Sequence, residues 1–209
     1  MEIDRTDINF QSHWEAQTAT KGWMSKISCK EDLVKQEHVG PNNKYGKKKV
    51  LRLRTMYGKH ELKGHGLECA FACGNSLYWI SKLFPKTTFD AFDFNYALEK
   101  IIPFIKEEHG NRLKEIWIGN AMNIPKPENN YDWINCGDFF EHTPEEAYWK
   151  ILKEVKRILK PGGLFGVYVG QAKLIQHIRV VPPEQTRKEL ESVGFKALSN
   201  YLFMKDYLK

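Results

Sequence analysis

The sequence lacks the features of a membrane-spanning or secreted protein. Its 209 residues contain no apolar run that approaches the length of a membrane-crossing helix. The first five residues, Met-Glu-Ile-Asp-Arg, are acidic where a secretory signal would carry basic residues followed by an apolar stretch. We therefore expect a cytoplasmic protein with no membrane partner.

Cysteine is also scarce. The four cysteines, at positions 29, 69, 73 and 136, include no Cys-x-x-Cys pair and form no disulfide framework. We expect reduced thiols that pack as small apolar side chains, and no zinc bound by cysteine. The sequence as a whole predicts no metal site.

The length and composition indicate one well-packed domain. With 42% hydrophobic residues, 209 residues are enough for one core and too few for two ordinary ones. We divide the chain into an N-terminal helical extension over residues 1–60, a candidate lid, and a main domain over residues 61–209. The break at Gly40-Pro41-Asn42-Asn43 separates two apolar stripes within the extension. The second stripe has helical spacing and consists of Val50, Leu51, Leu53, Met56 and Tyr57.

The main domain alternates between strand and helix patterns, which predicts a doubly wound α/β fold. Such a fold has a mostly parallel sheet, here of six or seven strands, with helices on both faces. Only 15 residues follow Gly194, so a closing strand is expected to be short or missing. The predicted strands lie near 65–71, 87–93, 114–119, 131–137 and 163–169, and the helices near 75–84, 95–109, 144–159 and 183–193. We expect Thr143 to cap the helix near 144–159, which should end at Lys160-Pro161-Gly162-Gly163.

The segment Leu67–Ser76 is the best candidate for a nucleoside-binding turn. An apolar run with an acid is followed by small residues at alternate positions, which lets the backbone approach a ligand closely. Asp93 lies nineteen residues past Gly74, where the tip of a second strand presents a carboxylate to a ribose diol. A helix cap is the alternative role for Asp93.

Further segments follow in the order found in one large family. The series resembles the class I S-adenosylmethionine-dependent methyltransferases over about residues 45–200, and the fold and cofactor are implied accordingly. The segments are Ile116–Met122, Tyr131–Asp138 and Arg157–Phe165, the last of which contains Lys160-Pro161-Gly162-Gly163.

The resemblance also implies a set of cofactor contacts. Glu68 and the turn at Ala70, Ala72 and Gly74 would hold the methionine part of S-adenosylmethionine, although the family usually has glycine at positions 70 and 72. Glu68 as a buried structural acid is an equal alternative. The other implied contacts are Asp93 to the ribose, Phe94 beside the adenine, Asn120, Ala121 and Met122 around the base, and Asn135 or Cys136 facing the amino group.

The acceptor side follows the fourth strand. His142 is the first candidate for a general base, because histidine can take a proton near neutral pH, and Asp138 is the second. A structural role at the helix start is an equal interpretation of His142. Glu141 next to His142 offers two metal ligands, which is weak evidence for an ion.

The connection from Gly170 to Pro182 is too short to form a large cover over the acceptor. We expect the cover to come from the N-terminal extension, with Trp14 and Trp23, or from a second subunit in a homodimer. His177 and Arg179 in this connection could meet an anionic acceptor, although exposed loop positions are commoner.

Residues 1–63 carry 13 Lys and Arg against 8 Asp and Glu, with the densest cluster at Lys47-Lys48-Lys49, Arg52 and Arg54. This cluster is either a solvated helix face or a site for a phosphate-bearing substrate or RNA. The leading hypothesis is methyl transfer to an oxygen or nitrogen of a small-molecule or sugar-containing acceptor. The alternatives are an RNA or protein methyltransferase and a non-catalytic partner subunit with the same fold.

Overall fold

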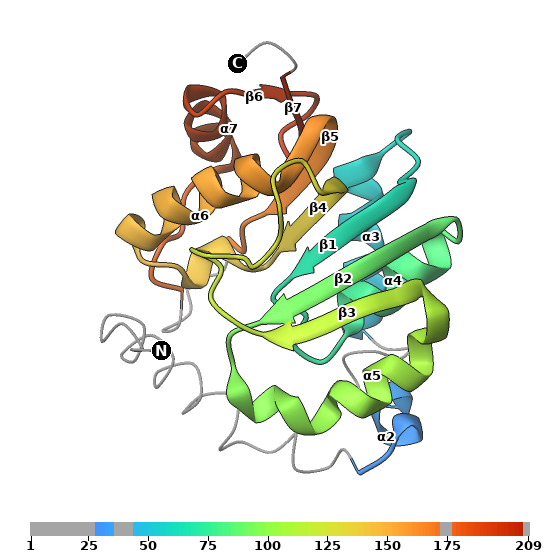
Figure 1. The fold of residues 1–209 in the computed structure, drawn as a ribbon. Helices are drawn as coiled ribbons and strands as arrows, with labels where there is room; N and C mark the ends of the chain where they lie inside the picture. The colour runs from blue at the N-terminus through green and yellow to red at the C-terminus, as the bar shows by residue number, and fades with distance from the viewer. Residues whose placement is uncertain (1–27, 36–43, 172–176, 207–209) are drawn as a thin grey trace.

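The computed structural model describes residues 28–35, 44–171 and 177–206. Seven strands form one sheet in the order β3-β2-β1-β4-β5-β7-β6, and β7 is antiparallel to both of its neighbours (Figure 1). The sequence prediction of a doubly wound, mostly parallel α/β fold is confirmed. The strands are β1 (Gly64–Cys69), β2 (Thr87–Asp93), β3 (Leu113–Ile118), β4 (Tyr131–Gly137), β5 (Leu159–Tyr168), β6 (Phe195–Ala197) and β7 (Leu202–Lys205).

Helices cover both faces of the sheet (Figure 1). One core joins the sheet to the helices that follow β4 and β5, and a second core joins it to those that precede β1 and follow β1 and β2. The helices are α2 (Lys30–Lys35), α3 (Lys44–Tyr57), α4 (Asn75–Leu83), η2 (Tyr96–Ile101), α5 (Ile102–His109), η3 (Gly110–Arg112), η4 (Phe140–His142), α6 (Glu145–Ile158) and α7 (Pro183–Ser192). None of the helices in the described ranges is long and apolar enough to cross a bilayer.

The chain reverses its direction of progress across the sheet between β1 and β4. β1 pairs in parallel with β2 on one side and with β4 on the other. At such a switch point the two neighbouring loops leave in opposite directions, and ligands bind in the crevice at the carboxyl ends of the strands. The turn after β1 and the segment after β4 are therefore placed where a ligand would bind.

The helix α3 belongs to the packed body of the molecule. Leu53, Met56 and Tyr57, at helical spacing, are 1–2% exposed and pack in the second core, whereas Leu51 is 66% exposed. The expected apolar stripe thus includes only part of the residues that spacing suggested. The division at residue 60 stays a proposal, and Trp14 and Trp23 lie outside the described residues.

Two local details differ from the sequence expectation. Thr143 does not cap α6, because its hydroxyl donates to the carbonyl of Phe139 and Pro144 occupies the cap position. The Lys-Pro-Gly-Gly segment lies inside β5, which begins directly after α6, and the pairing of β4 with β5 shifts there. At the other end, both closing strands are present, and β6 is only three residues long.

Candidate functional site

The turn after β1 has a backbone that alanine rarely adopts. Ala70 and Ala72 have φ angles of 58° and 46°, and Gly74 has a φ of 81° at the start of α4. This left-handed conformation favours glycine, because a Cβ atom crowds the neighbouring carbonyl. The turn thus keeps a glycine-type shape even though two of its small residues are alanines.

Asp93 holds this turn to the end of β2. Its side chain is 2% exposed, and its two oxygens accept the backbone N–H groups of Ala72 at 2.9 Å and Asn95 at 3.1 Å. Burial raises the pKa of Asp93 to about 6, while those N–H groups act in the opposite direction. A carboxylate has about four acceptor positions, so Asp93 keeps acceptor capacity after these two bonds are made.

A buried chain of polar side chains connects β1, β4 and α3. Tyr57 donates to Asn135 Oδ1 at 2.7 Å, and Asn135 Nδ2 donates to Glu68 Oε2 at 2.7 Å. The second oxygen of Glu68, Oε1, is buried and has no hydrogen-bond partner in the protein. Burial raises the pKa of Glu68 to about 8. The hydrogen bond of Tyr57 to the site was not predicted, because the apolar stripe to which Tyr57 belongs indicated packing alone.

The ends of β3 and β4 contribute smaller groups. Asn120 is exposed and its Oδ1 accepts the N–H of Met122 at 2.8 Å, so it shapes the turn in which Ala121 is buried. Phe94, after Asp93, is partly buried. Cys136 is fully buried, and burial raises its pKa well above the ordinary thiol value. All four cysteines are unpaired, as the sequence predicted.

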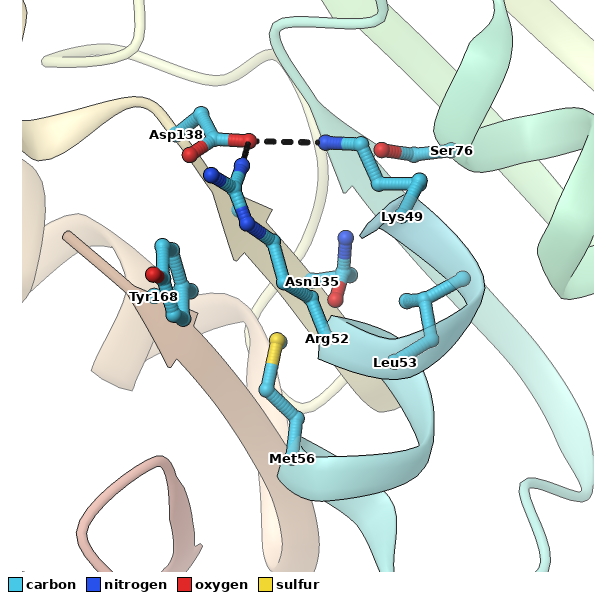
Figure 2. A pocket seen from close by; sticks show the side chains of 9 residues that line it. Lys49, Arg52, Leu53, Met56, Ser76, Asn135, Asp138 and Tyr168 are labelled. Atoms are coloured by element: carbon cyan, nitrogen blue, oxygen red, sulfur yellow. Dashed lines mark hydrogen bonds and ion pairs between the residues drawn. The ribbon is translucent and has the colours of Figure 1, made fainter. Parts of the chain in front are cut away.

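Asp138 faces two cations from α3 (Figure 2). Lys49 Nζ lies 2.9 Å from Asp138 Oδ2, and Arg52 donates to the same oxygen while its guanidinium lies 4.4 Å from the centre of the Tyr168 ring. Burial acts to raise the pKa of Asp138, but the two cations outweigh it and lower the pKa. These side chains surround a cavity of about 10 Å³, which is about the size of one water molecule.

The basic cluster expected from the sequence is therefore divided. Lys49 and Arg52 point toward Asp138, whereas Lys47, Lys48 and Arg54 are exposed. Two cations that sequence proximity grouped with the exposed ones instead neutralise an acid of the candidate site.

A second group lies just beyond Asp138. The ligand atoms of Glu141, His142 and His177 lie within 4.8 Å of one another, and the two imidazole rings are nearly perpendicular with centres 4.8 Å apart. Glu141 is 1% exposed, and its Oε1 accepts the Gly170 N–H at 2.8 Å. Burial and the charge of Asp138 raise the pKa of Glu141 to about 7. The proximity of His177 to Glu141 and His142 was not predicted, because these two residues lie 35 residues or more before it in the sequence.

Arg179 is not an exposed loop residue. It is 7% exposed, pairs with Glu145 and with Glu189 at 2.8 Å, and lies over the Tyr148 ring at 3.8 Å. The expectation that Arg179 is exposed is wrong, whereas its contact to an anionic acceptor stays a prediction. Its N–H also donates to the carbonyl of Glu141 at 3.1 Å, which fixes this part of the chain beside η4.

The parallel sheet, its switch point and the shaped turn after β1 define a Rossmann-like ligand-binding domain. A family model described as "Methyltransferase domain" matches residues 67–163, from β1 into β5. This match covers less than half of the chain, and over it the chain is similar to the class I, Rossmann-like methyltransferases.

Individual relatives agree with this family. Over 59 residues the chain is 47% identical to a demethylmenaquinone methyltransferase of Geobacillus sp. (strain WCH70), which covers 28% of the chain and 24% of that protein. The enzyme of the same name from Geobacillus stearothermophilus is 27% identical over 165 residues, covering 78% of the chain and 60% of that protein. The chain thus spans less than two thirds of the length of these relatives.

Among solved structures, phosphoethanolamine N-methyltransferase 2 of Haemonchus contortus, in complex with S-adenosyl-L-methionine, superposes with a TM-score of 0.64. The match covers 89% of the chain and 44% of that protein, with 16% sequence identity. At this identity the superposition supports the fold alone.

Proposed function

We propose that this protein is an S-adenosylmethionine-dependent methyltransferase that transfers a methyl group to an oxygen or nitrogen of a small-molecule or sugar-containing acceptor. The observation that carries the proposal is the left-handed turn at Ala70 and Ala72, bound by Asp93 next to the switch point, inside the region that matches the methyltransferase family. The names of the relatives, which refer to a small-molecule acceptor, support the choice of substrate class.

The residues at the carboxyl edge fit the methionine part of the cofactor. Glu68 Oε1 and Asn75 Oδ1 are buried acceptors without a partner in the protein, and they lie on either side of the turn. A buried acceptor without a donor is costly, so a ligand ammonium group at this place would gain charge-assisted hydrogen bonds. When bound, S-adenosylmethionine supplies the electrophilic methyl group.

The remaining contacts follow from the strand ends. Asp93 binds the ribose hydroxyls with its free acceptor positions, and Phe94 packs beside the adenine. Asn120, Ala121 and Met122 border the base, and the backbone of Asn135 or Cys136 faces the amino group. Since Asn120 already accepts the N–H of Met122, its main role is to shape this turn and present backbone groups.

On the acceptor side, His142 is the better candidate to receive the proton of the acceptor. Asp138 is bound by Lys49 and Arg52, and its lowered pKa makes it a weak base. His142 is 8% exposed and lies after β4 at the same edge of the sheet. We therefore assign two different roles to these residues: Asp138 orients α3, and His142 accepts the proton.

The family match does not identify the acceptor. The matched region, residues 67–163, leaves out both α3 and the segment that carries His177. The exposed Lys47, Lys48 and Arg54 keep an RNA or phosphate-bearing acceptor as the second candidate. A homodimer, the lid in residues 1–60 and a cytoplasmic location remain expectations of the sequence.

Calorimetry with S-adenosylhomocysteine tests the proposal directly. We expect saturable binding by the whole chain, weakened in Asp93→Ala and unchanged in a His60→Gln control, because His60 is exposed and precedes the amino end of β1, away from the turn at the carboxyl end of that strand. Absence of binding by the folded protein would leave only the third hypothesis, a partner subunit that uses the fold as an interaction scaffold.

A further inference from the structure

We propose that Glu141, His142 and His177 bind one divalent transition-metal ion, of which Zn²⁺ is the representative, at the carboxyl edge of β4 and β5. The three side chains come from two segments, η4 and the chain before α7, and offer two imidazole nitrogens and one carboxylate. Two histidines and one carboxylate, with the remaining positions open, form a donor set that suits zinc and iron sites in enzymes.

The carboxylate is prepared for a ligand. Glu141 is 1% exposed, its Oε1 is fixed by the Gly170 N–H, and its Oε2 is buried without a hydrogen-bond partner in the protein. An unpartnered carboxylate oxygen is expensive to bury, because it loses its hydration without compensation. A cation bound by this carboxylate would remove that cost, and two imidazoles with a ring nitrogen within 4.8 Å of a carboxylate oxygen complete the site.

The backbone holds the third ligand in place. The Arg179 N–H donates to the Glu141 carbonyl at 3.1 Å, and the ion pairs of Arg179 with Glu145 and Glu189 anchor the segment two residues after His177. Gly170 lets the segments approach, because a Cβ atom there would lie 2.3 Å from Glu141 Oε1 and 3.1 Å from His177 Cε1. These contacts therefore hold His177 close to Glu141 within the fold.

The present separations are close to those of a bound site. Metal bonds of about 2.0–2.2 Å place tetrahedral ligand atoms roughly 3–3.5 Å apart. The ligand atoms here lie within 4.8 Å of one another. Small rotations of the side chains, without movement of the strands, would close the site around an ion.

The site also suggests a substrate class, and this step rests on the proposed function. An ion at the carboxyl edge of β4 and β5 would lie on the acceptor side, where its open positions can bind a hydroxyl oxygen and favour loss of the hydroxyl proton to water. The oxygen then attacks the methyl carbon, and the carbon–sulfur bond breaks to leave a neutral thioether. The acceptor would therefore be a hydroxyl-bearing molecule, with His142 as a metal ligand instead of a proton acceptor.

Cobalt titration of the metal-free whole chain tests the site without any need for activity. We expect one Co²⁺ per chain with visible d–d absorption, displacement by Zn²⁺, and no displacement by Mg²⁺, which prefers oxygen ligands. A Cys29→Ser background removes the partly exposed thiol from the titration. The absence of saturable cobalt binding would refute the proposal.

Single variants assign the ligands. Glu141→Gln, His142→Gln and His177→Gln should each weaken cobalt binding by at least roughly 100-fold, since even loss of an outer partner costs about 10–100-fold. Glu141→Gln retains an oxygen that can accept the Gly170 N–H, so the fold should persist, and His60→Gln is the matched control at an exposed histidine. Equal affinity in the three variants and the control would overturn the site.

The test separates the ion from the proposed function. Cobalt binding without S-adenosylhomocysteine binding would support the metal site and contradict the methyltransferase assignment. Binding of S-adenosylhomocysteine without cobalt would support the assignment and overturn the metal site. If both bind and methyl transfer is lost on chelation and restored by Zn²⁺, the role of the ion at the acceptor is supported as well.

Discussion

The two halves of the carboxyl edge are built in different ways. The donor half, at the ends of β1, β2 and β3, is held by backbone hydrogen bonds, with Asp93 binding the N–H groups of Ala72 and Asn95. The acceptor half, at the ends of β4 and β5, is held by charged side chains from distant segments, including the pair of Lys49 with Asp138. The donor half is therefore a local structure, and the acceptor half is an assembly that depends on tertiary packing.

This difference has a chemical counterpart. In the donor half, the bonds of Asp93 to the Ala72 and Asn95 N–H groups are made within the chain itself, so the turn has its shape before a ligand binds. In the acceptor half, Asp138 is neutralised by its own cations, and Glu141 keeps one oxygen without a partner. Fixed geometry suits a cofactor that is the same in every cycle, while separately supplied side chains can be altered to suit a particular acceptor.

The largest expected effect is at His142 in the acceptor half. Replacing it with glutamine should lower the turnover of methyl transfer by roughly 10²–10⁴-fold, because the group that receives the proton or binds the ion is lost. The affinity for S-adenosylhomocysteine should stay within about twofold, since His142 is not part of the donor half. Turnover and calorimetry on the same preparation check both numbers.

A matched pair sharpens the result at His142. If His142 acts alone as a base, His177→Gln should leave turnover nearly unchanged, whereas shared metal binding predicts a loss in both variants. Full turnover in His142→Gln would return this residue to a structural role at the start of α6.

The next largest effect is expected at Asp93. Asp93→Ala should weaken S-adenosylhomocysteine binding by about 1.5–3 kcal/mol, as expected for the loss of a charge-assisted hydrogen bond to a buried diol. The same change should lower the free energy of unfolding by about 1–3 kcal/mol, because the Ala72 and Asn95 N–H groups lose their acceptor. Calorimetry gives the first quantity, and urea unfolding gives the second.

A comparison of two variants separates these effects. Asp93→Asn retains one side-chain oxygen for the turn but has no charge for the ribose, so it should recover stability more than affinity. Unchanged affinity in Asp93→Ala would show that Asp93 serves only the turn, and the donor half would then need another ribose ligand.

Glu68, between the two halves, should make stability depend on pH. Its folded pKa of about 8 lies above the ordinary value of 4.5, so the folded state binds an extra proton between these values. Its contribution to stability is therefore fully present below pH 4.5 and is lost as the pH rises through 8. Relative to Glu68→Gln, the wild type should lose on the order of 2 kcal/mol between pH 6.5 and 8.5.

Urea unfolding of both proteins at several pH values measures this difference, and all other titrating groups cancel in the comparison. The affinity for S-adenosylhomocysteine should change with pH in the wild type more than in Glu68→Gln, because an ammonium group favours the ionised carboxylate. A pH-independent difference in unfolding free energy would mean that Glu68 titrates normally in the folded protein.

The sequence predicted the donor half better than the acceptor half. In the donor half, the strand ending at Asp93 was predicted at the bounds that the structure gives, because a short apolar run with turns on either side determines where a strand ends. The position of the turn at Ala70 and Ala72 also followed from local pattern, but its left-handed backbone at two alanines did not. The ribose contact of Asp93 stays a prediction, and the structure shows that this side chain holds the turn.

The acceptor half could not be predicted in the same way. The ion pair of Asp138 with Arg52 joins residues 86 positions apart, and the approach of His177 to Glu141 depends on Gly170 and Arg179. Each of these residues is ordinary in its local sequence. Arg179 was misjudged because a loop position suggests exposure, whereas Glu145, Glu189 and the Tyr148 ring bury it.

The smallest effect concerns the two alanines of the donor half. A left-handed φ costs a non-glycine residue roughly 1 kcal/mol, and the extra freedom of glycine in the unfolded chain costs about 0.4–1 kcal/mol in return. Ala72→Gly should therefore raise the free energy of unfolding by less than about 1 kcal/mol.

Ala91→Gly, in the buried middle of β2 where φ is negative, should instead lower the free energy of unfolding by about 1 kcal/mol or more. Thermal unfolding of the two variants side by side tests the contrast, and equal losses of stability would show that the turn does not strain its alanines. Calorimetry on Ala72→Gly should also give an affinity for S-adenosylhomocysteine equal to or a few times tighter than that of the wild type, because removing the methyl group widens the approach to the backbone of the turn.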